Sequence, residues 1–421
     1  MSVFTRSRTT TVIGGIALVG ASALVLAGCT GGGDGTGGET SAPPTEERDL
    51  SLSIGTVLPQ TGALSYLGPP EEAGVGLAVA DINEAAKGIT VEVQFGDSGD
   101  PDNKAYETTV PRLLDSGVSA LIGAASSGVT KLFLDQAVSS GVITFSPANT
   151  SPDFTTWDDN NLYWRTAPSD LLQGEVLGNL IAEDGHQTLG IIYLNDAYGT
   201  GLEAALTENF EAAGGEVVAS QAYNATDTTY DAQVSAIMAE NPDAIAVIGF
   251  VETSTIVPAF VADGFDGGNF YFVDGNISQW GADMPVPIEG TKGTQPGPVL
   301  EDDFIERLNG WWTGEGNEEL ADLNYAAESY DAVVLLALAS LVANSTEGTE
   351  IAAHLQEVSG GSGEGEKCTS FEECADIILS GGTADYDGYS GAITFDDAGD
   401  PTEASMGIFE YGPDNTHTRI N

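Results

Sequence analysis

Basic side chains are scarce in this chain. Lys and Arg number 12 against 64 Asp and Glu, which gives a formal charge of −52 over 421 residues. A surface of this sign repels the phosphates of nucleic acids and of anionic lipids, so charge attraction to either is excluded. The excess of carboxylates favours solubility in salty surroundings, where salt screens their repulsion. It does not indicate which ligand the protein binds.

Cysteine is equally rare, with three residues in the chain. Cys368 and Cys374 stand six positions apart, and in an exported protein this spacing favours a local disulfide. A metal site is the alternative. It is disfavoured because no second cysteine pair is present and the three histidines lie far apart in the sequence. We therefore expect a disulfide, with no metal or cofactor.

One long apolar run stands near the N-terminus, at residues 11–26, after the basic residues Arg6 and Arg8. The run is rich in small residues and ends in Leu-Ala-Gly-Cys at Cys29. This pattern predicts a lipoprotein signal peptide over residues 1–28. A permanent transmembrane helix is the alternative, which the interrupting small residues disfavour. Lipid on Cys29 would anchor the protein to the outer face of the cytoplasmic membrane.

Residues 29–49 are rich in Gly, Thr and Pro and show no apolar periodicity, which predicts a flexible tether. About 370 residues follow, which suits two domains better than one core. Short β-rich runs then alternate with amphipathic helical patterns, and the alternation restarts after Arg165. It predicts an α/β fold built from βαβ units with parallel sheets. An apolar helix over residues 325–342 is expected to return and cover the first sheet.

Six motifs then occur in a fixed order: GTVLPQTGALSYLG (55–68), GLAVADIN (76–83), LIGAASSGVT (121–130), FSPANTSPDFT (145–155), WRTAPSDLLQG (164–174) and IIYLNDAYGTGL (191–202). On these motifs the chain resembles the amino-acid-binding lipoproteins of ABC importers, in the Leu/Ile/Val-binding group of type I periplasmic binding proteins. The resemblance implies two Rossmann-like lobes with parallel sheets, joined by three hinge crossings, and a ligand held in the cleft between them. It also implies permease subunits of an ABC importer as partners.

The resemblance places the hinge crossings near residues 165–168, 290–295 and 390–395. We expect the first lobe to comprise residues 50–166 plus 297–390. The second lobe would comprise residues 167–296 plus 391–421.

A free amino acid needs hydrogen-bond donors for its carboxylate and an acid for its ammonium group. Ser127 lies between a predicted buried strand and a helix, where such donors gather, although an N-cap is the alternative. With the resemblance, Ser127 becomes a carboxylate ligand. Thr150 follows the next strand and offers a hydroxyl and an N–H to the carboxylate, while the Ala148 carbonyl can accept from the ammonium group. A helix cap is again the alternative.

The resemblance assigns further ligand contacts to the second lobe. Tyr198 would close over the ligand, Phe250 would face the cleft, and Asp274 would pair with the ammonium group. Asp274 could instead be a turn residue, because Asp-Gly is a common turn pair. Glu252, on the same side of the cleft, is the alternative acid for the ammonium group.

In the first lobe, Tyr66 and Leu67 would line the pocket for the ligand's side chain, a branched-chain or other apolar group.

Three other functions compete with that of an amino-acid importer. An amide or urea receptor shares the fold but would not need an acid for an ammonium group. A sensing module would need a separate membrane receptor. An enzyme is disfavoured because the chain has no G-x-S-x-G motif and no histidine near a plausible nucleophile.

Overall fold

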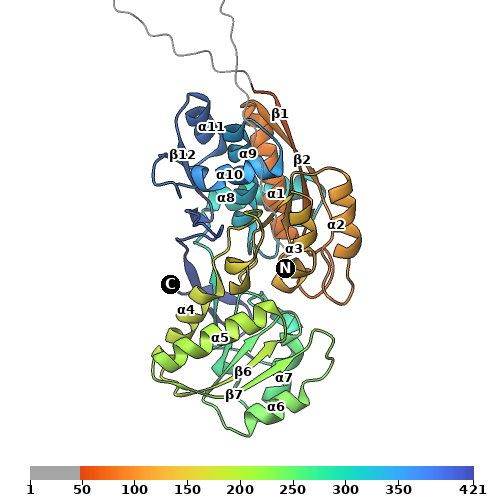
Figure 1. The fold of residues 1–421 in the computed structure, drawn as a ribbon. Coiled ribbons are helices and arrows are strands. Elements are labelled where there is room, and N and C mark those ends of the chain that lie inside the picture. The colour runs from red at the N-terminus through yellow and green to blue at the C-terminus, as the bar shows by residue number, and fades with distance from the viewer. Residues whose placement is uncertain (1–47) are drawn as a thin grey trace, which may run out of the picture. The chain divides into compact units, whose positions relative to one another are not determined.

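The computed structural model describes residues 48–421. The predicted signal peptide, the predicted lipid site Cys29 and the predicted tether up to residue 47 lie outside the described residues. The described part contains two large sheets and one small sheet. We call the part built on the five-stranded sheet the first lobe, and the part built on the seven-stranded sheet the second lobe (Figure 1).

The first lobe begins with five parallel strands in the order β2-β1-β3-β4-β5. The chain alternates between these strands and helices, as the sequence pattern predicts. The elements are β1 (Leu50–Val57), α1 (Gly68–Ala85), β2 (Ile89–Gln94), α2 (Tyr106–Asp115), β3 (Ala120–Gly123), α3 (Ser127–Ser139), β4 (Ile143–Ser146), a 3-10 turn (Pro152–Thr156) and β5 (Tyr163–Arg165).

The second lobe has a sheet in the order β15-β14-β10-β9-β8-β6-β7, parallel from β10 to β7 and antiparallel at β14 and β15. Its elements are α4 (Asp170–Glu183), β6 (Thr188–Leu194), α5 (Ala197–Ala212), β7 (Glu216–Tyr223), α6 (Asp231–Met238), β8 (Ala244–Ile248), α7 (Thr253–Ala262), β9 (Phe270–Phe272), β10 (Lys292–Pro296), β14 (Met406–Tyr411), β15 (His417–Arg419) and two 3-10 turns (Gly267–Asn269 and Gly281–Asp283).

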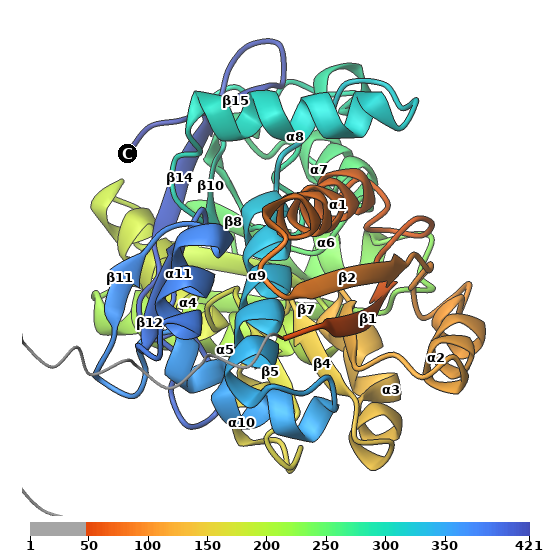
Figure 2. The same ribbon diagram turned by 90° about the horizontal axis from the view of Figure 1, so that it is seen from above.

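The chain returns to the first lobe between β10 and β14. There it forms α8 (Asp302–Gly314), α9 (Ala326–Ala343), α10 (Gly348–Val358), β11 (Glu366–Cys368), α11 (Phe371–Leu379), β12 (Ala384–Gly388) and β13 (Gly391–Ala392). Figure 2 shows α9 between α1 and α10, over the first sheet. Its side chains share one core with those of β1 to β4, which confirms the prediction that this helix covers the first sheet. Among the described helices, α9 alone is long and apolar enough to span a membrane, but 89% of it is buried inside the protein.

The second connection between the lobes lies close to its predicted position, and the last lies later than predicted. β10 pairs with β9, and with β14 as far as Pro296, so the chain leaves the second sheet at the predicted lobe boundary of 296/297, just after the crossing predicted near residues 290–295. The last connection reaches the second sheet only at Met406. Before it, Phe395 packs on Phe145 and Trp164 of the first lobe, with ring centroids 6.0 and 5.2 Å apart. Residues around Phe395 therefore belong to the first lobe, since this ring is buried in the first-lobe core.

A disulfide joins Cys368 and Cys374, whose Cα atoms lie 5.4 Å apart. Both cysteines are buried, at the end of β11 and within α11. Cross-linking so short a loop is expected to stabilise the fold by about 2 kcal/mol through the entropy of the unfolded chain. We expect the double variant Cys368→Ala/Cys374→Ala to lose about this amount in equilibrium urea unfolding. A loss within error of zero would contradict this prediction.

Glu71 on α1 is an acid in an apolar environment. It is fully buried, and neither of its carboxylate oxygens has a hydrogen-bond partner among residues 48–421. Burial raises the pKa of Glu71 well above its ordinary value of 4.5, and the nearby Glu72 and Glu328 raise it further. The folded protein therefore holds a proton here that the unfolded chain releases as the pH rises above 4.5, so stability is lost on going from acid to neutral pH.

We expect Glu71→Gln to remove this pH-dependent loss. At pH 8 the melting temperature should rise by roughly 3 °C or more, since domains of this size shift by about 2–4 °C per kcal/mol. Near pH 4 the change should be small, because the carboxyl group is then neutral in both states. Scanning calorimetry across this range measures both effects. Glu84→Gln, an exposed acid on the same helix, is the matched control, and equal shifts in the two variants would refute the assignment.

Candidate functional site

The predicted ligand contacts lie just beyond the carboxyl ends of parallel strands, where α/β sheets bind ligands. In the first lobe, Ser127 follows β3, and Ala148 and Thr150 follow β4. In the second lobe, Tyr198, Phe250 and Asp274 follow β6, β8 and β9. The structure brings most of these together in one central pocket, which is lined by Leu64, Leu67, Ala125, Ser126, Ser127, Ala148, Tyr198, Phe250, Asp274, Gly275 and Tyr325.

In the loop after β3, one serine caps the next helix and its neighbour lines the central pocket. Ser126, not Ser127, is the N-cap of α3, and its side chain accepts a hydrogen bond from the Val129 N–H at 3.3 Å. The Ser127 hydroxyl oxygen accepts from the Ser151 N–H at 3.3 Å, and the Ser127 side chain lines the central pocket. The N-cap alternative weighed for this loop therefore holds for Ser126 and not for Ser127.

Thr150 and Tyr66 lie beside the central pocket rather than in its lining. Thr150 is buried, and its carbonyl accepts from the Asp170 N–H at 2.7 Å. Tyr66 reaches across from the first lobe and donates to the Gly275 carbonyl of the second lobe at 3.0 Å. Tyr66 therefore links the two lobes directly in this arrangement.

Asp274 is held by two tyrosines from different parts of the chain. Tyr198 and Tyr325 each donate to one of its carboxylate oxygens at 2.6 Å, and Asp274 is only 4% exposed. Burial raises the pKa of Asp274, while these two hydrogen bonds lower it. Tyr198 also stacks on Phe250, with ring centroids 5.5 Å apart. The two hydrogen bonds thus fix the position of the Asp274 carboxylate in the lining of the pocket.

Asp170, which no sequence pattern singled out, is a second buried acid beside the first. It is fully buried at the start of α4, and neither carboxylate oxygen has a hydrogen-bond partner within the described part of the chain. Burial raises the pKa of Asp170 well above its ordinary value and the Asp274 carboxylate raises it further, while the Thr150 hydroxyl and the nearby Arg165 guanidinium oppose both. Two acids are therefore buried close together, and burial raises the pKa of each.

The rival acid Glu252 is engaged elsewhere. It accepts hydrogen bonds from the Tyr223 hydroxyl and from the Phe250 N–H, the latter at 3.0 Å. It lines a separate pocket of about 290 Å³ at one mouth of the cleft, not the central pocket.

A buried arginine supports the loop that carries Thr150. Arg165 at the end of β5 donates to both carboxylate oxygens of Asp400, at 2.6 and 2.7 Å. It also donates to the carbonyls of Asn149 and Ser151, at 3.3 and 2.8 Å. The ion pair therefore fixes the backbone on either side of Thr150.

The central pocket has room for about one water molecule, with a volume near 10 Å³. No Lys or Arg is among the described residues that line it. The pocket in this arrangement therefore has no room for a molecule larger than about one water. Among residues 48–421, no group of three or more His, Cys, Asp or Glu could hold a metal ion.

Sequence reasoning missed Asp170 and Tyr325 for understandable reasons. Asp170 follows Ser169, which caps α4, so it looks like an ordinary acid in the first turn of a helix. Its full burial was the missing signal. Tyr325 lies in a left-handed conformation, with φ of 61°, just before α9. It lies 51 residues from Asp274 in sequence, and no local pattern connects the two.

Comparison with known proteins agrees with this geometry. A sequence profile of the periplasmic binding protein family matches residues 51–359. The chain is 26% identical to the chemotactic signal transduction system substrate-binding protein BasB of Halobacterium salinarum, over 83% of this chain and 84% of that protein. It is 29% identical to the leucine-, isoleucine-, valine-, threonine- and alanine-binding protein of Pseudomonas aeruginosa, over 44% of this chain and 50% of that protein.

The fold also matches a solved structure. The leucine-binding protein LivK of Thermotoga maritima superposes with a TM-score of 0.71, over 88% of this chain and 98% of that protein, at 21% identity. The profile match, the mostly parallel sheets and the pocket at their facing edges agree with one another. Proteins of this family bind ligands outside the cytoplasm. The chain belongs to the periplasmic binding protein family, and it is similar in sequence or fold to members that bind leucine, isoleucine and valine.

Proposed function

We propose that this protein captures an amino acid, branched-chain or otherwise apolar, for an ABC importer. The observation that carries the proposal is the fixed Asp274 carboxylate, which faces the loops of Ser127 and Thr150 across the central pocket. The acid suits the ligand's ammonium group, and the hydroxyl and N–H groups of the two loops suit its carboxylate. The ligand is bound without chemical change.

Hinge closure is the proposed mechanism, as is general for periplasmic binding proteins. The lobes separate, the ligand enters, and closure restores contacts between lobes such as the one from Tyr66 to Gly275. A ligand that contacts both lobes favours the closed arrangement by its differential affinity.

A thermal-shift screen of residues 48–421 tests the ligand class. A ligand that binds only the folded state raises the melting temperature, by an amount set by its concentration relative to its Kd. We expect leucine, isoleucine or valine to do so, with the corresponding amides weaker. If no amino acid shifts the transition while an amide or urea does, the amide receptor replaces this proposal.

A lipid anchor at Cys29 would keep the protein at the outer face of the cytoplasmic membrane. We expect the Cys29→Ser full-length chain to move from the membrane fraction to the medium or the soluble fraction on cell fractionation. Unchanged membrane association would show that another segment holds the protein there.

A sensing role is the second candidate, because a relative matched over most of both chains belongs to a chemotactic signal transduction system. The two roles predict different consequences for a deletion strain. Loss of uptake of labelled amino acid with intact chemotaxis supports the importer. Loss of chemotaxis toward the amino acid with intact uptake supports the sensor.

A further inference from the structure

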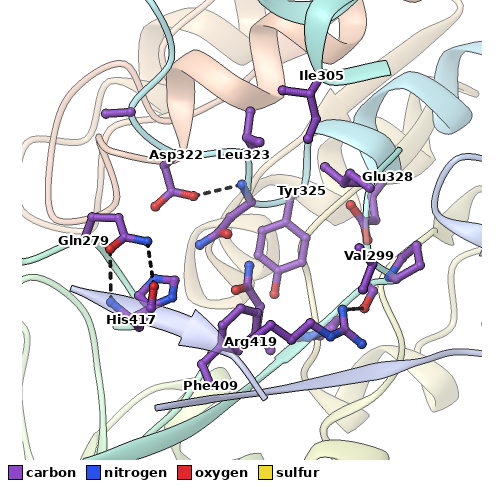
Figure 3. Close-up of a pocket in the computed structure, with 17 residues that line it drawn as sticks. Gln279, Val299, Ile305, Asp322, Leu323, Tyr325, Glu328, Phe409, His417 and Arg419 are labelled. Atoms are coloured by element: carbon purple, nitrogen blue, oxygen red, sulfur yellow. Dashed lines mark hydrogen bonds between the residues drawn. The ribbon is translucent and has the colours of Figure 1, made fainter. Parts of the chain in front are cut away.

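A second and much larger pocket lies next to the central one, with a volume of about 330 Å³ (Figure 3). Tyr325 separates the two, since it lines both pockets and donates to Asp274. The first lobe contributes the loop from Pro298 to Leu300, part of α8, residues 321–325 and the start of α9. The second lobe contributes Gln279, the end of β10, Phe409 of β14 and two residues of β15. Any molecule bound here would contact both lobes.

The first-lobe side of this pocket carries two acids without cations. Glu328 on α9 is 5% exposed, and its carboxylate has no hydrogen bond or ion pair with another residue in the described range. Asp322 accepts from the Asn324 N–H at 2.9 Å, and burial raises the pKa of Asp322 to about 6. At Gly297, which has φ of 112°, a side chain would begin 3.1 Å from the Glu328 carboxylate, so glycine keeps this end open.

The second-lobe side carries donors without acids. Arg419 on β15 donates to the Gly297 carbonyl at 2.9 Å and to the Asn421 side chain at 3.1 Å, and it has no ion pair among residues 48–421. Gln295 is 5% exposed, and its side-chain amide makes no hydrogen bond to any other described residue.

His417 completes this side. Both of its ring nitrogens are buried without a partner in the described part of the chain, and burial lowers the pKa of His417 to about 4. The ring is therefore neutral at physiological pH and packs edge-on against Phe409 and Tyr411.

We propose that this pocket is a second ligand site, which takes a small zwitterion whose ammonium end meets Glu328 and whose carboxylate end meets Arg419. Apolar side chains in the same lining, such as Leu323 and Phe409, suit a short methylene chain. Each end of such a ligand complements unpaired groups of a different lobe. Its binding therefore favours closure of the central pocket and acts on capture of the first ligand through the shared Tyr325.

Isothermal titration calorimetry of the Asp274→Asn variant with ω-amino acids, from glycine to 6-aminohexanoate, tests the site. This variant disables the proposed central site, so its loss of leucine binding reports on that function alone. We expect at least one ω-amino acid to bind, and to bind at least tenfold more tightly than hexylamine or hexanoate, which each lack one charged end. Absence of binding by every member of the series overturns the proposal.

Two further variants in the same background assign the contacts. Glu328→Gln and Arg419→Met should each weaken binding at least tenfold, whereas Arg112→Met, a change at a distant first-lobe arginine, should not. If Glu328→Gln and Arg419→Met leave the affinity unchanged, the ligand binds elsewhere and the proposal is wrong. Should Arg419→Met fail to fold, the carboxylate contact is tested by comparing single-ended analogues with the zwitterion in the protein that keeps Arg419.

Release of a proton on ligand binding would test the assignment of Glu328. Burial raises the pKa of Glu328 to about 8, and Asp331 on the same helix raises it further. Glu71 on α1 also lies near it, and Arg419 faces it across the pocket. Glu328 is thus mostly protonated at pH 7, and an arriving ammonium group favours its ionised form. Binding should release close to one proton, seen as a buffer-dependent enthalpy, and the release should vanish in Glu328→Gln.

Discussion

Asp274→Asn is expected to weaken binding of the captured amino acid by roughly 3–5 kcal/mol, more than a hundredfold in Kd. The substitution keeps the shape of the side chain but removes the charge that faces the ligand's ammonium group. Because Asp274 is almost fully buried, water cannot replace the lost partner. Calorimetric titration with the amino acid found in the thermal screen measures the loss.

Tyr325→Phe is the matched control for this prediction. It removes one hydrogen bond to Asp274, made at 2.6 Å, but leaves the carboxylate in place. We expect the binding free energy of the amino acid to weaken by about 1.5–3 kcal/mol at most, the scale of a hydrogen bond to a charged group. If Asp274→Asn binds as tightly as the unchanged protein, the ammonium group contacts another residue. Asp170, the neighbouring buried acid, would then be the next candidate.

Asp400→Ala is expected to destabilise the fold by about 3–5 kcal/mol, the cost of leaving a buried charge without its partner. The Arg165 side chain is fully buried, and that of Asp400 is 10% exposed. Equilibrium urea unfolding at neutral pH measures the effect. Asp153→Ala is the control, because its ion pair with Lys131 lies at the surface and should contribute about 0–1 kcal/mol.

Asp400→Ala should also weaken binding of the amino acid. Arg165 holds the carbonyls of Asn149 and Ser151, so a loosened arginine frees the loop that carries Thr150. We expect amino-acid affinity to fall in Asp400→Ala under conditions where the variant is still folded. Equal losses of unfolding free energy in Asp400→Ala and Asp153→Ala would show that the buried ion pair stabilises the fold no more than the surface ion pair does.

Much of the fold could be predicted from the sequence. The apolar spacing of residues 170–183 and 253–262 predicts helices there, and the structure has helices over the same residues. The β-rich run of residues 50–58 predicts the first strand, and β1 ends one residue earlier. The secondary structure of such segments can be predicted because it depends on residues that are close together in the sequence. The helix after Tyr325 was also predicted to cover the first sheet, since a helix apolar on most sides needs burial.

Residues of the candidate site could be predicted where the chain passes from a strand to a helix. Ser127, Ala148, Tyr198, Phe250 and Asp274 were chosen at such junctions, and the structure brings them into one pocket. Their roles toward a ligand remain predictions. The acid pair of Asp170 and Asp274 could not be foreseen, because it joins residues about a hundred positions apart.

The sequence by itself determined the excess of acid, the order of strands and helices, and the junctions at which binding groups gather, because each depends on composition or on near neighbours. Tertiary structure alone decided which acids are buried, and so which have unusual pKa values. It alone decided that Arg165 pairs with Asp400, 235 positions later, and that the unpaired groups of two lobes face one pocket. Burial and long-range pairing arise from how distant segments pack, and no local pattern records that packing.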